Sequence, residues 1–348
     1  MTKVAIVILN WNGEKLLREF LPEVIKHSEH PDVEVIVADN ASSDQSLSII
    51  AEEFPSVKTI VLDKNYGFTG GYNRALKKID ADYTVLLNSD VAPGKDWLLP
   101  MIKEMDKNPQ TAICVPKIKS YRNPEYFEYA GAAGGYTDRF GYPFCKGRIF
   151  NELEKDHGQY NHSADIFWAS GAALMIRTKL YIQEGGLDED FFAHMEEIDL
   201  CWRLKNRGWN IRYVAESEIF HLGGATLDYK NPRKVYLNFR NNLFLLIKNL
   251  PNNTLFIHLL QRMLLDGLAG IKFLLSGEFK NFYSVIKAHL MFYGSFAKMY
   301  HKRKINLKSG IQFVHKEMYP HSIVNQFFIH KRKKFTELAE IEKVDQIK

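Results

Sequence analysis

The sequence predicts an α/β fold: a Rossmann-like, mixed but mostly parallel sheet flanked by helices, with a helical region at the C-terminus. Short apolar runs alternate with helical patterns through the first 90 residues, which is typical of parallel strands joined by right-handed crossovers. Two of these runs end in acidic residues, and open α/β sheets bind ligands beyond the carboxyl ends of their strands. The chain of 348 residues is 46% hydrophobic, which suffices for a large core.

The first four apolar runs are short and dense enough to be buried strands. They cover residues 4–9, 33–38, 57–62 and 83–87. Apolar residues between 16 and 25 recur at helical spacing, and Pro22 is expected to break that helix. Further helices are predicted through residues 47–54 and from residue 67 onward.

The fourth strand ends abruptly in three polar residues, Asn88, Ser89 and Asp90. Pro93 and Gly94 follow closely, so the Asp90 carboxylate is predicted to lie at a turn beside the sheet edge. We interpret it as a site residue. The alternative is that Asp90 only caps the helix that follows.

The second strand ends at Asp39, and a glycine-rich loop at residues 65–73 lies between the two acidic strand ends. Its glycines would let the backbone approach a ligand closely, and the helix that begins there offers free N–H groups to an anion. An ordinary turn into a helix is the alternative. No Walker A loop is present, and no Gly-x-Gly-x-x-Gly follows the first strand, which argues against a dinucleotide-binding enzyme.

Residues 120–159 are rich in Tyr, Phe and Gly and show little periodicity. This composition predicts a long loop region of the functional kind. Its aromatic rings would suit flat polar ligands such as sugars, or would pack on the core.

Two adjacent carboxylates, Glu196 and Glu197, open a predicted helix. They repel each other, so one is expected to have a raised pKa, as a general base near neutral pH requires. Asp199 and Arg203 form an i, i+4 pair on the same helix, which we interpret as a surface salt bridge.

His221 follows a strand predicted at residues 211–214. A single histidine at a strand end is more often structural than a ligand. Together with Asp90, however, it would give a metal ion one nitrogen and one oxygen ligand.

The net charge of +5 hides an asymmetry, because residues 230–348 contain 21 Lys and Arg against 7 Asp and Glu. Helical patterns rich in Leu and Phe run from 234 to 299, with breaks near Pro251 and Gly277, and charged residues interrupt every run long enough to span a bilayer. This predicts amphipathic helices on an anionic membrane surface. Covering the catalytic domain or forming a homodimer interface is the alternative, and no nucleic-acid-binding motif is found.

These patterns divide the chain into three predicted segments: a catalytic domain at residues 1–230, an amphipathic helical region at 231–300 and a basic tail at 301–348.

Three cysteines without Cys-x-x-Cys spacing favour a reducing compartment over a disulfide framework or a thiolate zinc site. The N-terminus is predicted to be a strand, not a signal peptide.

The ordered motifs together resemble the family 2 inverting glycosyltransferases, especially their bacterial rhamnosyltransferase-like branch. Each motif alone is weak, but seven in the same order are specific, and the resemblance spans about residues 3–250. The matching segments are residues 7–13, 37–44, 65–73, 86–90, 170–172, 196–203 and the segment around His221.

The resemblance implies a GT-A fold and a nucleotide-diphosphate-sugar donor, dTDP-rhamnose-like or a UDP-sugar. The acceptor would be a hydroxyl of a glycan or lipid-linked saccharide in cell-surface polysaccharide synthesis, at the cytoplasmic face of the plasma membrane. It further implies Glu197 as the base, with Glu196 and Asp199 as alternates, and a divalent cation, Mg²⁺ or Mn²⁺, on Asp90 and His221. The implied donor-binding residues are Asn10, Asp39, Asn65, Gly70, Gly71, Asn73, Asn88 and Ser89.

Two positions depart from the family pattern. Asn88 replaces an acid, which lowers the charge at the implied metal site, and Glu197 replaces Asp, which lengthens the reach of the base by a methylene. A catalytically inactive sugar-binding subunit is therefore one alternative. A sugar nucleotidylyltransferase is another, although it would want a Gly-rich, Arg-containing loop after the first strand, where residues 10–13 read Asn-Trp-Asn-Gly.

Overall fold

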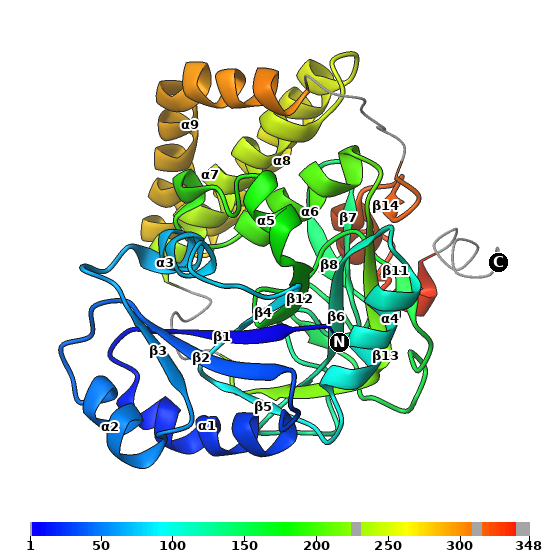
Figure 1. Ribbon diagram of the computed structural model, residues 1–348. Helices are drawn as coiled ribbons and strands as arrows, with labels where there is room; N and C mark the ends of the chain where they lie inside the picture. The colour runs from blue at the N-terminus through cyan, green and yellow to red at the C-terminus, as the bar shows by residue number, and fades with distance from the viewer. Residues whose placement is uncertain (1, 224–230, 308–314, 339–348) are drawn as a thin grey trace.

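The computed structural model describes residues 2–223, 231–307 and 315–338. It confirms the predicted α/β class: a large mixed sheet crosses the molecule, and helices pack around it (Figure 1). The order of the large sheet is β11-β13-β6-β12-β4-β1-β2-β3, with β5 paired to β13. Its strands are β1 (Val4–Asn10), β2 (Val33–Asp39), β3 (Lys58–Val61), β4 (Tyr83–Leu87), β5 (Val91–Pro93), β6 (Thr111–Ser120), β11 (Ala164–Asp165), β12 (Ala173–Arg177) and β13 (Asn210–His221).

The four predicted strands β1 to β4 form the parallel part of this sheet. Strand β12 inserts antiparallel between β4 and β6, while β13 runs parallel to β6. The helices are α1 (Glu14–His27), α2 (Ser46–Glu53), α3 (Gly67–Leu76), α4 (Leu98–Lys107), α5 (Thr178–Gln183), α6 (Glu196–Asn206), α7 (Pro232–Asn249), α8 (Leu255–Leu275), α9 (Phe279–Asn306) and α10 (Ile323–Phe328), with 3-10 turns η1 (Glu189–Phe191) and η2 (Phe335–Glu337).

The prediction that Pro22 breaks the first helix is wrong, because α1 continues through it to His27. Leu21 and Val24, on either side, are buried in the core beneath the sheet. Packing of this face stabilises the helix despite the lost backbone hydrogen bond, since most helical stability in proteins comes from tertiary contacts.

The prediction of a long loop at residues 120–159 is also wrong in its second half, which forms a small sheet. Rings from this region, such as Tyr136 and Phe144, are buried in the core instead of lining a mobile loop. Strands this short give no periodic signal, and one of them pairs with a segment near residue 318. The order is β10-β9-β8-β7-β14, for β7 (Gly135–Asp138), β8 (Pro143–Cys145), β9 (Arg148–Ile149), β10 (Glu152–Leu153) and β14 (Met318–Tyr319).

The three long C-terminal helices gather at the end of the molecule opposite α1 and α2 (Figure 1). Helix α7 is part of the core that packs on the large sheet, because residues 243–247 belong to the same buried cluster as residues of the sheet. Helices α8 and α9 form a hairpin on it, and α9 runs past the expected boundary at 300. Residues 224–230, 308–314 and 339–348, which include parts of the predicted boundary and tail, lie outside the described residues. Within the described ranges, none of the helices has the length and apolar character needed to cross a bilayer.

Candidate active site

The carboxyl ends of three neighbouring strands lie side by side at one edge of the large sheet. Asn10 in β1 pairs with Asp39 in β2, and Ile8 in β1 pairs with Leu87 in β4. Residues 88–90 therefore emerge beside Asn10 and Asp39. Parallel register alone brings together these predicted residues from three distant stretches of the chain.

Asp39 is fully buried at this edge and holds the neighbouring turn in place. It accepts hydrogen bonds from Asn10 Nδ2 at 3.1 Å and from the backbone N–H of Ser42 at 2.9 Å. Asn10 Oδ1 is buried and has no hydrogen-bond partner among the described residues. A buried acceptor left without a donor is costly, so a ligand N–H or O–H would be stabilised here.

The loop before α3 is shaped by two asparagines. Asn40 Nδ2 donates to Asn65 Oδ1 at 3.0 Å, and Asn40 Oδ1 accepts from the backbone N–H of Tyr66 at 2.9 Å. Asn65 Oδ1 also accepts from the N–H of Gly67, which has a positive φ of 69°. Asn65 is thus a structural part of the loop before α3, and Asn40 is a residue that the sequence analysis missed.

Three of the predicted donor-binding residues make close contacts with other residues of the protein in this structure. They are Gly70, Gly71 and Asn73. A Cβ at Gly71 would lie 2.7 Å from the side chain of Leu9, so the glycine allows α3 to lie close to β1. A Cβ at Gly70 would lie 2.9 Å from Tyr66 Cβ. Asn73 Nδ2 donates to the carbonyl of Leu187 at 2.8 Å, and Asn73 Oδ1 accepts from the N–H of Leu187 at 3.0 Å. The side chain of Asn73 therefore fastens the loop at 187 to α3.

Asp90 and His221 meet, as predicted. His221 Nε2 lies 3.1 Å from Asp90 Oδ1, and both side chains are buried. On the other side of the ring, His221 Nδ1 lies 3.2 Å from Glu128 Oε2. Burial alone would lower the pKa of His221, but the hydrogen bonds and charges of Asp90 and Glu128 outweigh it and raise the pKa to about 10. Glu128 was not predicted, because it stands in an aromatic stretch without a recognisable pattern.

The donor set of Asp90 and His221 would fit a divalent cation that also binds a diphosphate once His221 gives up the proton that its two carboxylate neighbours stabilise. It offers one carboxylate oxygen and one imidazole nitrogen, and Mg²⁺ or Mn²⁺ commonly takes its remaining ligands from phosphate oxygens and water. Within residues 2–223, 231–307 and 315–338 there is no group of three or more His, Cys, Asp and Glu side chains arranged as metal ligands. The protein would thus supply only part of the coordination.

The two adjacent glutamates lie at the start of α6, after a strained turn in which His194 and Met195 both have positive φ. Burial and the charge of Glu197 raise the pKa of Glu196 well above its usual value. Burial also raises the pKa of Glu197, to about 7, although hydrogen bonds from backbone N–H groups, including that of Gly171, oppose the shift. Oε2 of each glutamate is buried without a hydrogen-bond partner in the described part of the chain.

Glu197 is joined to the strand edge through Gly171. Glu197 Oε1 lies next to Gly171, whose ideal Cβ would be 4.0 Å away. The next residue, Ala172, accepts a backbone hydrogen bond of 2.9 Å from the N–H of Asn88. The Glu197 carboxylate and Asn88 therefore both contact one short backbone segment, residues 171–172.

The predicted surface salt bridge of Asp199 is buried, which is a correction. Asp199 accepts from Arg203 Nε at 2.9 Å, from Lys248 Nζ at 2.7 Å and from Asn249 Nδ2 at 2.9 Å. Burial alone would raise the pKa of Asp199, but the charges of Lys248 and Arg203 outweigh it and hold the pKa below its usual value. The partner lysine comes from α7, which i, i+4 spacing could not reveal.

Helix α7 also holds the turn that precedes Glu196. Asn241 Nδ2 lies within 2.9 Å of three backbone carbonyls, those of Phe191, Ala193 and His194. Arg240 Nη2 donates to Phe191 O at 2.9 Å. These two side chains therefore stabilise the positive-φ turn before α6, and the sequence analysis assigned them no role.

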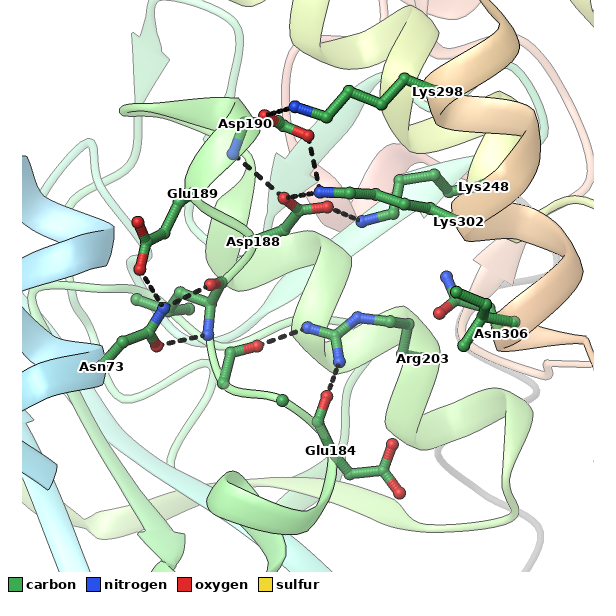
Figure 2. Close-up of a pocket in the computed structure, with 14 residues that line it drawn as sticks. Asn73, Glu184, Asp188, Glu189, Asp190, Arg203, Lys248, Lys298, Lys302 and Asn306 are labelled. Carbon is green, nitrogen blue, oxygen red and sulfur yellow. Dashed lines mark hydrogen bonds and ion pairs between the residues drawn. The ribbon is translucent and has the colours of Figure 1, made fainter. Parts of the chain in front are cut away.

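The pocket in Figure 2 lies beside this turn and has a volume of about 370 Å³. Lys248 and Lys302 bind Asp188 at 2.6 and 2.5 Å, and Lys298 binds Asp190 at 2.5 Å. Neither Asp90 nor Glu197 lines this pocket, so it is distinct from the strand-edge site. Its ion pairs connect α7 and α9 with the loop that leads to the glutamates.

Residues 5–171 match the model of the family described as glycosyl transferase family 2. An N-acetylglucosaminyl-diphospho-decaprenol L-rhamnosyltransferase of Mycobacterium tuberculosis is 26% identical over 234 residues, which are 62% of this chain and 75% of that protein. The rhamnosyltransferase WbbL of Escherichia coli K12 is 25% identical over 227 residues, 63% of this chain and 83% of that protein.

The fold is also similar to that of the crystal structure of GalNAc-T7 with UDP, GalNAc and Mn²⁺. The TM-score is 0.55 at 15% identity, and the match covers 69% of this chain and 47% of that one. At this identity the similarity shows the GT-A fold alone. The family match of residues 5–171 and the two rhamnosyltransferase relatives support a family 2 glycosyltransferase of the rhamnosyltransferase-like branch.

Proposed function

We propose that this protein is an inverting glycosyltransferase that moves a sugar from a nucleotide-diphosphate donor, dTDP-rhamnose-like or a UDP-sugar, to a hydroxyl of a glycan or lipid-linked acceptor. The observation that carries the proposal is the Glu197 carboxyl, which has a pKa of about 7 and lies against Gly171, beside the edge from which Asp90 emerges. A general base works best when its pKa is near the working pH. The names of the two rhamnosyltransferase relatives support a deoxyhexose donor and, in one of them, a polyprenyl-diphosphate acceptor.

In the proposed reaction, the acceptor oxygen attacks the anomeric carbon while the bond from that carbon to the diphosphate oxygen breaks. The nucleoside diphosphate leaves with the bonding electrons, and the proton of the acceptor hydroxyl moves to Glu197. Oε2 is the atom that would receive it, because Oε1 faces Gly171 and Oε2 has no partner among the described residues. Attack opposite the leaving group inverts the anomeric configuration.

The two alternates are less suited to this role. Burial and the charge of Glu197 raise the pKa of Glu196 well above its usual value, which favours the neutral form of its carboxyl. Asp199 is bound by Arg203, Lys248 and Asn249, which makes it a weak base with no free approach. We therefore assign proton transfer to Glu197.

Donor binding is assigned to the strand edge. Asp39 and the unpaired Asn10 Oδ1 would receive N–H or O–H groups of the nucleoside, and Asn88 and Ser89 lie where the diphosphate would approach Asp90. Asp90 and His221 would hold Mg²⁺ or Mn²⁺, which supplies Lewis-acid stabilisation of the negative charge on the leaving diphosphate. The site of the protein's action would be the cytoplasmic face of the plasma membrane, where polysaccharide precursors carried on lipid are found.

The test is a thermal-shift screen of UDP-, dTDP- and GDP-sugars in the presence of Mn²⁺, followed by donor hydrolysis and transfer assays with the best donor. We expect one nucleotide class to raise the melting temperature, and Glu197→Gln to bind that donor without turning it over. Glu125→Gln, at an exposed carboxylate, is the matched control. Full turnover by Glu197→Gln would contradict the assignment of the base. Failure of every nucleotide sugar to bind would contradict the proposed function.

A further inference from the structure

We propose that the outward face of the α8–α9 hairpin, defined below by its exposed apolar residues, binds the surface of an anionic membrane. The inference rests on the proposed function only for the reason why the protein would bind a membrane, which is to bring the site to a lipid-linked acceptor. The surface itself is argued from exposure, burial and charge.

The outward face of α8 and α9 is a continuous apolar stripe. Leu264 and Leu268 in α8 are each 63% exposed, and Leu290 in α9 is 64% exposed. Single exposed apolar residues are common on proteins, but stripes along two adjacent helices form a patch of the kind that marks a binding surface. The residues recur every three or four positions, as on one helix face. The stripe is made of Phe256, Leu260, Leu264, Leu268, Ile271, Leu275, Phe279, Tyr283, Ile286, Leu290 and Tyr293.

The inward face of the same hairpin buries an ion pair beside its apolar residues. Arg262 and Asp266 are 3% and 0% exposed and are joined by a hydrogen bond of 2.7 Å between Arg262 Nε and Asp266 Oδ1. His289 of α9 lies 3.2 Å from the second oxygen of Asp266. The hairpin therefore buries an ion pair while a row of large apolar side chains is left exposed, which is unusual for helices on a protein surface in water. Such a hairpin fits an apolar medium on its outer side.

The charges on the hairpin identify this medium. Residues 255–306 contain eight Lys and Arg but only two acids, Asp266 and Glu278. Asp266 is buried, whereas Lys272, Lys280 and Lys287 are exposed between the apolar positions. Lysines beside an apolar helix face are typical of helices that lie in the plane of an anionic bilayer surface. In a symmetric dimer through this face, the lysines would meet lysines with few acids to pair with, which disfavours a second copy as the occupant.

Helix α9 connects this face to the site. Its Lys298 and Lys302 bind Asp190 and Asp188, which lie in the loop just before the turn that presents Glu197. A membrane in contact with the hairpin would thus be connected, through α9, with the segment that positions the proposed base. A lipid-linked acceptor requires such a connection.

The test uses the full-length protein with vesicles of phosphatidylcholine alone or mixed with phosphatidylglycerol. We expect it to sediment with the mixed vesicles and to be released when NaCl is raised from about 0.1 to about 0.5 M. The triple variant Leu264→Gln, Leu268→Gln, Leu290→Gln should lower the partition coefficient at least about tenfold, since each leucine contributes apolar area to the bilayer interface. Leu153→Gln with Ile182→Gln, at exposed apolar positions elsewhere, should bind like the unmodified protein.

Circular dichroism and the melting temperature of each variant show that it is folded, and the replaced side chains are exposed in every case. Donor binding by thermal shift, measured without vesicles, reports on the proposed function separately from membrane binding. Three outcomes would overturn the inference: no sedimentation with mixed vesicles, equal binding to neutral vesicles, or unchanged binding of the triple variant. A stable dimer in analytical ultracentrifugation that the triple variant dissociates would assign the face to a second copy instead.

Discussion

Helices α1 and α8 differ in the side chains that they bury and expose. Helix α1 buries Leu17 and Phe20 against the sheet and exposes its charged residues, whereas α8 buries Arg262 and Asp266 and exposes Leu264. Both helices are amphipathic, so amphipathic periodicity alone does not tell which face is inside. The difference shows that the exposed side chains of α1 suit contact with water, whereas those of the α8–α9 hairpin suit contact with an apolar partner.

The largest expected effect lies in the catalytic domain. Glu197→Gln removes the carboxylate that accepts the proton but keeps the shape of the side chain, so transfer should fall by about 10²–10⁴-fold while donor affinity stays the same. The measurement is steady-state turnover together with donor binding. A fall of less than about threefold would mean that the base lies elsewhere.

In the outer hairpin, the largest effect should be on stability. Arg262→Met leaves the Asp266 carboxylate buried without its guanidinium partner, so we expect a loss of about 3–5 kcal/mol in the free energy of unfolding. The double variant Arg262→Met with Asp266→Leu removes both charges and should be much closer to the unmodified protein. Urea denaturation of both variants gives the values. Equal losses of unfolding free energy in the single and double variants would show that losing the Arg262–Asp266 pair, and not leaving Asp266 unpaired, causes the destabilisation.

The connection between the two regions can be tested at Asn241, which donates to three carbonyls of the turn before α6. Asn241→Ala should lower kcat about tenfold through misplacement of Glu197, with little change in the KM for the donor. Asn253→Ala, at an exposed position in the same region, is the control. An Asn241→Ala enzyme with full kcat would leave this side chain with a purely structural role.

The pH dependence should follow Glu197. Its pKa is raised from 4.5 to about 7, so the active carboxylate form is populated above this value and lost as the pH falls through it. At saturating substrate, the rate should therefore decline below about pH 7 and approach a tenfold loss per pH unit. A plateau reaching down to pH 5 would show that a base with an ordinary pKa is at work.

The smallest expected effect is on the stability of the outer face. Leu264→Gln should change the free energy of unfolding by no more than about 0.5 kcal/mol, because the side chain is already exposed to water. Urea denaturation checks this. A loss of about 2–3 kcal/mol would indicate that the face is covered in solution, which would weaken the contrast with α1.

Local sequence patterns were sufficient to predict strands β1 to β4 and the polar residues at their ends. Runs of apolar residues predicted β1 to β4, and the polar residues that end three of these strands do lie at one sheet edge, because parallel register aligns carboxyl ends. The contact between Asp90 and His221 was also predicted, from the chemistry of metal ligands. The resemblance to family 2 glycosyltransferases added the function to be expected.

Other features depend on partners that no local pattern shows. Glu128 approaches His221 from a stretch without periodicity, and the small sheet is completed by a strand near residue 318. The predicted break at Pro22 failed because tertiary packing stabilises α1 more than the missing hydrogen bond weakens it.

Composition and spacing along the chain established an α/β enzyme with acids at its strand ends and a cationic, apolar helical region behind it. Three features emerged when distant segments packed together: the pairing of Asp199 with Lys248, the burial of Glu197 Oε2 without a hydrogen-bond partner among the described residues, and the inward direction of Arg262. The physical reason is that periodicity defines the two faces of an element, whereas burial and charge pairing depend on what each face contacts.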